Sequence, residues 1–430
     1  MRPWKNHAVG FSKMNPQDSS QTMSDLHFLF LQGLPSPFFS RIAKGLTSIG
    51  CKATGVNFCV GDQMFWRGPN TVNYRGKLSD WPRFIANFLD ENHVTDIVLL
   101  GEQRSYHKVA IEAASKRNIR VTVTDFGYLR PDWITLERDG MGGNSRFPKD
   151  PDTMLKLASI LPHADLARRY TDSFWTMAIN DMLYHFSNLF FGWLFPFYIR
   201  PYKRDNPVLH YPSIGIRLLF SGTNNRKAER VLSELKSRHA KYFLFPLQLE
   251  NDFQIIAYSP FENMEEAVRV VIKSFAENAQ DGTRLLVKLH PLEPGLKNWK
   301  KLIYSYAREF GIEERIDFID GGNLEEIIDG SSGMITVNST AGIHALRLGS
   351  PVKVLGQAIY DIAGLTYQGN LDEYWKDARK PDMELVGAFI KAIAHTVMIR
   401  GVFYSEPGLN DAVCEAVALL YEGRVGAHGL

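Results

Sequence analysis

The chain has 430 residues, enough for two or three domains, and its 45% hydrophobic and 22% charged residues are typical of a folded globular protein. Its formal net charge of +2 excludes a global field that would attract nucleic acid. The three cysteines, Cys51, Cys59 and Cys414, are too few for a disulfide framework and lack metal-binding spacing, which favours a reducing compartment. Residues 1–24 are polar and lack the apolar core of a secretory signal, and we expect them to be a disordered extension.

Residues 25–206 are predicted to form an N-terminal Rossmann-like domain, because short apolar runs alternate with amphipathic helical patterns. The expected strands are 26–31, 53–60, 96–100 and 120–124, and the expected helices are 38–49, 80–92 and 109–116. The glycine loop after the first strand lacks the full dinucleotide fingerprint, so the sequence does not predict an NAD site.

Two acidic residues, Glu102 and Asp125, follow consecutive strands of this predicted domain. Because the carboxyl ends of parallel strands meet at one edge of a sheet, we expect the two carboxylates to lie together. Paired carboxylates suit a glycosyl transfer that retains the anomeric configuration. The alternative is that both residues cap helices or form ion pairs with Arg104 and Arg130.

Residues 207–380 are predicted to form a second Rossmann-like domain. It is expected to begin with a linker at 207–212. The expected helices are 226–238, 263–278 and 323–328, and the expected strands are 242–247, 285–289 and 333–338. C-terminal helices are expected to follow within 381–430. One strand ends on His290, and another leads through Ser339 and Thr340 into a helix. These three side chains are expected to converge on one phosphate. The alternative is that Ser339 only caps its helix and His290 only ends its strand.

The segment 174–204 is rich in aromatic residues and ends in a basic cluster. It is interrupted by Gly192 and Pro196 and is too short for a membrane span, but aromatic residues beside cations suit the surface of an anionic membrane. The expected membrane contacts are Phe190, Phe191, Trp193, Arg200, Lys203 and Arg204. The alternative is a buried helical hairpin between the domains.

Five motifs then indicate a family. They are Phe126 to Glu137 (FGYLRPDWITLE), Gly101 to Arg104 with His107, Phe245 to Gln248 with Asp252 and Gln254, Lys288 to Pro291, and Val337 to Gly342. Together they resemble bacterial capsular polysaccharide biosynthesis proteins of the KpsS type, over nearly everything from Leu26 to Gly364. The long FGYLRPDWITLE run is the most specific motif, whereas the His-Pro and Ser-Thr pairs are shared with bacterial sialyltransferases.

The resemblance implies a retaining β-Kdo transferase with two facing Rossmann-like domains, the GT-B-like architecture. It implies CMP-Kdo as donor, a lipid acceptor such as phosphatidylglycerol or its lyso form, and initiation of the poly-Kdo linker of a capsular polysaccharide. It implies no metal or other cofactor. The expected location is cytoplasmic and peripheral, on the inner face of the cytoplasmic membrane, with other capsule assembly proteins as candidate partners and no nucleic acid. The chain departs from the family pattern at Glu102, where we expect Asp, and at Thr124 to Phe126, where we expect a Glu-rich triplet.

Site roles follow from strand ends and from the motifs. Asp125 is the expected nucleophile, Glu102 the acid–base group, and His107 the third catalytic residue. The expected CMP-Kdo-binding residues are His290, Pro291, Ser339, Thr340, Gln248, Asp252, Arg104 and Arg130. The acidic run at 150–152 is interpreted as a loop with a helix cap and not as a metal signature.

Two further functions remain open from the sequence. One is an inverting transferase that uses CMP-sialic acid, and the other is a non-catalytic scaffold of the capsule assembly and export complex. Analysis of the product anomer separates the first alternative from a retaining enzyme. Failure to transfer or hydrolyse CMP-Kdo would favour the scaffold.

Overall fold

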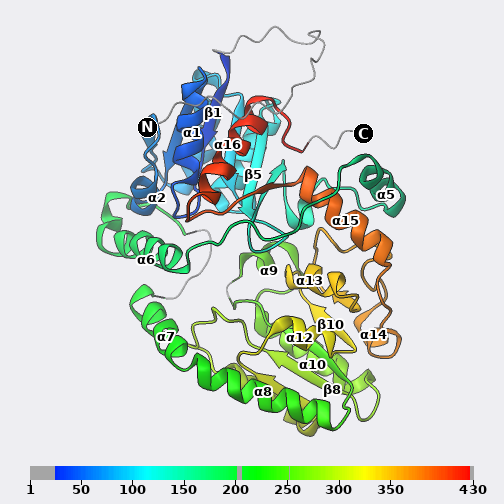
Figure 1. Cartoon of the computed structure of the whole chain (residues 1–430). Coiled ribbons are helices and arrows are strands. Elements are labelled where there is room, and N and C mark those ends of the chain that lie inside the picture. The colour runs from blue at the N-terminus through cyan, green and yellow to red at the C-terminus, as the bar shows by residue number, and fades with distance from the viewer. Residues whose placement is uncertain (1–24, 201–205, 251, 427–430) are drawn as a thin grey trace.

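Two parallel-stranded α/β units face each other in the computed structural model, which describes residues 25–200, 206–250 and 252–426 (Figure 1). This arrangement confirms the predicted GT-B-like fold of two Rossmann-like domains with C-terminal helices. The predicted extension 1–24 and the predicted membrane contacts Lys203 and Arg204 lie outside the described residues.

The first sheet has seven strands in the order β12-β6-β5-β4-β1-β2-β3. The five from β5 to β3 are parallel, and β6 pairs antiparallel with both β5 and β12. The strands are β1 (His27–Phe30), β2 (Lys52–Asn57), β3 (Asn70–Asn73), β4 (Asp96–Leu100), β5 (Arg120–Phe126), β6 (Trp133–Arg138) and β12 (Met398–Arg400). The helices of this unit are α1 (Phe38–Ser48), α2 (Val60–Phe65), α3 (Trp81–Glu91), α4 (Ser105–Ser115), α5 (Pro151–Ile160), α6 (Phe174–Phe191) and, from the end of the chain, α16 (Gly408–Tyr421).

Alternation along β1 divides the first unit into two apolar layers. Leu29 packs in a cluster with Trp81 of α3, whereas Phe28 and Phe30 pack on the opposite face with Phe38 of α1. Successive side chains of a strand point to opposite faces, so a strand buried on both sides is apolar throughout. This explains the uninterrupted apolar run by which the strand is predictable.

The second sheet has five parallel strands in the order β11-β10-β7-β8-β9. They are β7 (Tyr242–Pro246), β8 (Arg284–Lys288), β9 (Ile316–Ile319), β10 (Gly333–Thr336) and β11 (Val352–Val354). The helices are α7 (Pro207–Leu219), α8 (Ser221–Ser237), α9 (Phe253–Tyr258), α10 (Met264–Asn278), α11 (Trp299–Glu309), α12 (Leu324–Asp329), α13 (Ala341–Arg347), α14 (Leu371–Asp377) and α15 (Met383–Thr396).

The elements differ from the expected ones in three places. The sequence did not predict β6, which Trp133–Arg138 forms within the FGYLRPDWITLE run and which pairs antiparallel with β5. The expected linker at 207–212 is the start of α7, capped by Asn206, whose side chain accepts the Val208 N–H. The sequence also did not predict β12, which Met398–Arg400 forms between the expected C-terminal helices and which joins the first sheet.

The two units share one apolar core. Residues from the first half of the chain, such as Tyr128 and Phe147, lie in the same buried cluster as Phe389 of α15 and Ile343 of α13. The rings of Phe147 and Phe389 meet edge to face with centroids 5.7 Å apart. This core holds the carboxyl edges of both sheets in a fixed relation to each other.

Candidate functional site

Asp125 lies at the carboxyl end of β5, where the first sheet faces the second unit. Its carboxylate accepts the Phe126 backbone N–H at 2.7 Å. Burial raises the pKa of Asp125, and the Phe126 amide followed by the positive charges of Arg130 and Arg104 opposes that rise. Burial and the nearby arginines therefore act in opposite directions on the ionisation of this carboxyl group.

Arg130 joins the two units electrostatically. The residue as a whole is exposed, yet its guanidinium lies 4.8 Å from the centre of the Phe126 ring. Burial of this group lowers the pKa of Arg130, and the carboxylates of Asp125 and Asp252 oppose that fall. Asp252 belongs to the second unit, where it caps α9 by accepting the Gln254 N–H at 2.9 Å. Burial raises the pKa of Asp252, and Arg130 partly offsets this. One cation therefore serves a carboxylate from each unit.

His290 follows β8 and lies in the same electrostatic neighbourhood. Burial, followed by the charges of Lys288, Arg130 and Arg217, lowers its pKa to about 4, so the unliganded imidazole is neutral at pH 7. Its Nδ1 accepts the Leu292 backbone N–H at 3.1 Å, which places the ring proton on Nε2. His290 can therefore donate a hydrogen bond to an anion, but it brings no charge of its own before the anion binds.

We expect His290→Ala to weaken CMP binding by about tenfold or more, since a hydrogen bond to a charged group contributes roughly 1.5–3 kcal/mol. Titration calorimetry with CMP measures the effect, and His163→Ala, at an exposed histidine of the first unit, is the matched control. Equal CMP affinity in the wild type and in His290→Ala would contradict this role.

Gln248 and Asn338 connect the ends of β7 and β10. The Gln248 amide nitrogen lies 3.0 Å from Asn338 Oδ1 and 3.2 Å from Asp252 Oδ2, and the Asn338 backbone N–H donates to Gln248 Oε1 at 3.1 Å. Gln248 is buried and both ends of its amide are engaged. The structure thus places this predicted ligand residue as a support for Asp252 and for the loop before α13.

The turn before α13 carries the other predicted phosphate contacts. Ser339 Oγ accepts the Ala341 N–H at 3.2 Å, whereas Thr340 occupies the N-cap position without a capping bond from its side chain. Pro291 is exposed beside His290. Ser339 thus lies one residue before the N-cap, where its oxygen accepts a backbone N–H and its hydroxyl hydrogen remains available as a donor.

Glu102 does not lie open at the sheet edge, which is where the sequence predicted it. It is buried under α9 of the second unit, where Tyr258 donates a short hydrogen bond to Oε1, and the Met141 N–H and Asn144 Nδ2 lie 3.4 Å from the same atom. Burial raises the pKa of Glu102, and Oε2 has no hydrogen-bond partner. Glu102 therefore neither caps a helix nor forms an ion pair with Arg104 in this structure.

A second buried carboxyl group, which the sequence does not single out, lies beside Glu102. Glu137 of β6 accepts the Tyr128 hydroxyl at 2.5 Å and a short bond from Ser145. Burial raises its pKa to about 8, and the negative charge of Glu102 adds to the rise. The only sequence signal was the position of Glu137 at the end of the FGYLRPDWITLE run.

His107 is fully buried in α4, and its ring nitrogen Nδ1 lies 2.8 Å from the carbonyl oxygen of Gly101. Burial lowers the pKa of His107 to about 3, so the ring is neutral. The contact fixes the loop that carries Glu102 and Arg104. His107 is therefore enclosed by protein and supports this loop.

Several aromatic side chains of the segment 174–204 are exposed, although Phe195 is buried. Trp193 is 72% exposed and Phe190 is 64% exposed, and Arg200 lines a pocket under α6. Phe191 is also exposed. No helix among the residues that the structure describes is both long enough and apolar enough to cross a bilayer.

The acidic run at 150–152 caps α5, as predicted. Asp150 accepts the Thr153 N–H at 2.8 Å and Pro151 begins the helix. Within residues 25–200, 206–250 and 252–426, no group of three or more His, Cys, Asp or Glu side chains is arranged to hold a metal ion.

The fold and site define a two-unit α/β protein whose facing sheet edges place carboxylates, arginines and a neutral histidine together. The family model for capsule polysaccharide biosynthesis proteins matches residues 95–404, and the chain belongs to this family. It is 32% identical over 387 residues to the capsule polysaccharide export protein KpsS of Escherichia coli, with 89% of this chain and 98% of the relative covered. It is 30% identical over 390 residues to the capsule polysaccharide modification protein LipB of Neisseria meningitidis serogroup B, with 88% and 92% covered.

Among solved structures, the chain is similar to KpsC of Thermosulfurimonas dismutans, a β-Kdo 2,7 transferase. The TM-score is 0.40 at 14% identity, with 92% of this chain and 99% of that chain covered.

Proposed function

We propose that the chain is a glycosyltransferase that moves Kdo from CMP-Kdo to phosphatidylglycerol or its lyso form, with retention at the anomeric carbon. The product would start the poly-Kdo linker of a capsular polysaccharide. One observation carries the proposal. In a chain of the capsule polysaccharide biosynthesis family, the charge of Arg130 acts on the pKa of Asp125 in its own unit and on those of Asp252 and His290 in the other.

The second unit is suited to the CMP part of the donor. Its phosphate carries a single negative charge, which a hydrogen bond from His290 Nε2, the hydroxyls of Ser339 and Thr340 and the nearby charge of Arg130 can stabilise as the leaving group departs. The planar guanidinium of Arg130 also suits the carboxylate of Kdo. In this proposal, protein side chains alone stabilise the charge on the departing CMP.

Retention requires two displacements or a front-face path. In the two-step route, Asp125 attacks the anomeric carbon, CMP departs, and the acceptor hydroxyl then displaces the enzyme carboxylate. A base must accept the proton of that hydroxyl. The buried Glu102 and Glu137 have raised pKa values suited to proton transfer, but both are covered by Tyr258 or Tyr128 in this structure, so access would require those contacts to open.

Incubation with CMP-Kdo and lyso-phosphatidylglycerol, followed by mass spectrometry and analysis of the anomer, tests the proposal. A lipid product carrying one β-linked Kdo supports it. A product with inverted configuration would indicate an inverting transferase of the sialyltransferase kind, and neither transfer nor hydrolysis of CMP-Kdo would indicate a non-catalytic scaffold.

We also propose that no metal or other cofactor takes part. Excess EDTA should leave the transfer rate unchanged, because protein donors and cations provide the charge stabilisation that Mg²⁺ gives to diphosphate donors. Rates measured with and without EDTA, with extensive dialysis as a second removal step, test this. Loss of activity that Mg²⁺ or Mn²⁺ restores would contradict it.

The membrane part of the proposal places the protein on the inner face of the cytoplasmic membrane, where other capsule assembly proteins are candidate partners. Exposed aromatic side chains of α6 and the following turn support it. We expect Phe190→Ser with Trp193→Ser to reduce co-sedimentation with anionic vesicles severalfold. Ile160→Ser, at a 63% exposed apolar residue on α5, is the control. Equal co-sedimentation of the double variant and the wild type would contradict a membrane role for this segment.

A further inference from the structure

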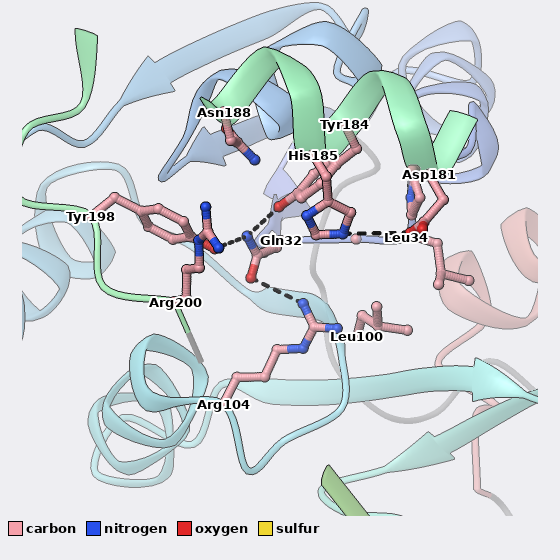
Figure 2. Close-up of a pocket in the computed structure, with 12 residues that line it drawn as sticks. Gln32, Leu34, Leu100, Arg104, Asp181, Tyr184, His185, Asn188, Tyr198 and Arg200 are labelled. Atoms are coloured by element: carbon pink, nitrogen blue, oxygen red, sulfur yellow. Dashed lines mark hydrogen bonds and ion pairs between the residues drawn. The ribbon is translucent and has the colours of Figure 1, made fainter. Parts of the chain in front are cut away.

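A pocket lies beneath α6, inside the first unit (Figure 2). Its walls come from the loop after β1, the residue before α4, the inner face of α6 and residues 198 and 200. The pocket holds about 110 Å³, which suits a small polar group and not an acyl chain. None of the predicted donor contacts of the second unit lines it.

Two arginines give the pocket a positive wall. Arg104 and Arg200 both line it, and Figure 2 shows both guanidinium groups directed toward Gln32 at its centre. One carboxylate among the lining residues, Asp181, is engaged by His185 at 3.5 Å and by the Tyr211 hydroxyl at 2.8 Å. Two arginines against one carboxylate leave the lining residues with a net positive formal charge, which favours an anionic ligand.

A buried carboxyl group fixes the direction of one arginine. Gln32 Nε2 lies 3.0 Å from Asp62 Oδ1, so the amide must turn its oxygen to the other side, where Arg104 Nη1 donates to it at 2.9 Å. Tyr184 of α6 also donates to Asp62 at 2.8 Å. The position of Arg104 is thus tied both to the β1 loop and to α6.

The pocket adjoins the candidate nucleophile. The charge of Arg104 acts on the pKa of Asp125, and the pKa of the buried Tyr404 is raised by burial and then by Asp181 of the pocket, with Asp125 also contributing. Leu100, at the end of β4, lines the pocket and pairs with Thr124 of β5, the residue before Asp125, so the pocket adjoins the sheet edge that carries Asp125. A group bound in the pocket can present a neighbouring hydroxyl to that edge.

The helix over the pocket, α6, is amphipathic. Asp181, Tyr184, His185 and Asn188 recur at helical spacing and line the pocket. The exposed side chains of Trp175, Ile179, Leu183 and Phe190 recur on the opposite face. A helix that rests on a bilayer by this apolar face holds the pocket about one helix diameter, ~10 Å, from the lipid surface.

We propose that this pocket is the acceptor site and that it takes the phosphate-bearing head group of an anionic lipid. Arg200 and Arg104 contact the phosphate, the head-group hydroxyl points toward Asp125, and the acyl chain leaves past the exposed Ile199 and Phe197 beside Arg200. This inference rests on the proposed function for the identity of the reaction, but not for the binding itself.

Kinetics with varied lyso-phosphatidylglycerol at saturating CMP-Kdo tests the site. Arg200→Ala should raise the acceptor KM about tenfold while hydrolysis of CMP-Kdo without acceptor stays unchanged. Arg200→Lys should restore part of the affinity, and Leu34→Trp, which fills the pocket, should also raise the acceptor KM. Arg230→Ala, at an exposed arginine of α8, is the control and should match the wild type. An unchanged acceptor KM in both Arg200→Ala and Leu34→Trp would overturn the proposal.

A binding measurement separates this inference from the proposed function. Glycerophosphoglycerol, the water-soluble head group without acyl chains, should bind the wild-type protein in calorimetry and lose that binding in Arg200→Ala. Binding with no transfer from CMP-Kdo would leave the site standing and contradict the proposed reaction. Transfer in the wild type with no head-group binding, or with binding equal in Arg200→Ala, would overturn the site alone.

Discussion

Replacing Asp125 with asparagine is expected to reduce Kdo transfer by about a thousandfold or more, because a neutral amide cannot attack the anomeric carbon. The side chain is close in size, and its carboxamide oxygen can still accept the Phe126 N–H that now reaches the carboxylate at 2.7 Å. The fold should therefore persist, and CMP affinity should change little. Initial rates with CMP-Kdo and lyso-phosphatidylglycerol, together with CMP titration, measure the two effects separately.

Trapping gives a second, independent result for the same carboxylate. Wild-type protein incubated with CMP-Kdo and no acceptor, then digested, should carry Kdo on the peptide that contains Asp125. Asp90→Asn, at an exposed carboxylate paired with Arg117, is the matched control and should retain the adduct and the rate. An adduct on the Glu102 peptide would exchange the roles, and a double Asp125→Asn, Glu102→Gln variant with the normal rate would end the carboxylate mechanism.

The alternation of strands and helices was predictable because it depends on local patterns. Strands such as 96–100 are buried on both faces, so their apolar runs mark them within a residue or two. The second unit was predictable for the same reason. His290 and the Ser339 turn were found because each follows such a strand.

The features that the sequence did not predict depend on contacts between residues that are far apart in the chain. The FGYLRPDWITLE run has the glycine and proline of a loop, and its second half becomes β6 because β5 and β12 flank it. Glu102 follows a strand as a catalytic group would, yet Tyr258, more than 150 positions away, covers it. The pocket residues Gln32 and Tyr184 are likewise brought together across 152 positions.

Arg130 provides the second large effect, because one guanidinium acts on a carboxylate from each unit. We expect Arg130→Ala to lower kcat/KM for CMP-Kdo about a hundredfold, or ~2.7 kcal/mol of transition-state stabilisation. The loss combines a contact to the donor carboxylate with the positive charge beside Asp125. Arg146→Ala, at an exposed arginine that pairs with Asp139, is the control.

The pH dependence separates the two contributions. A nearby positive charge favours the ionised carboxylate, so its removal raises the pKa of Asp125 above a value that burial already raises. Because an ionised nucleophile is needed, activity is lost as pH falls through that pKa, and the acid limb of kcat/KM should move to higher pH in Arg130→Ala. Arg130→Lys keeps the charge but loses the planar fork, so its acid limb should stay near the wild-type position while its KM for CMP-Kdo rises. An acid limb that does not move in Arg130→Ala would show that the arginine binds the donor without tuning Asp125.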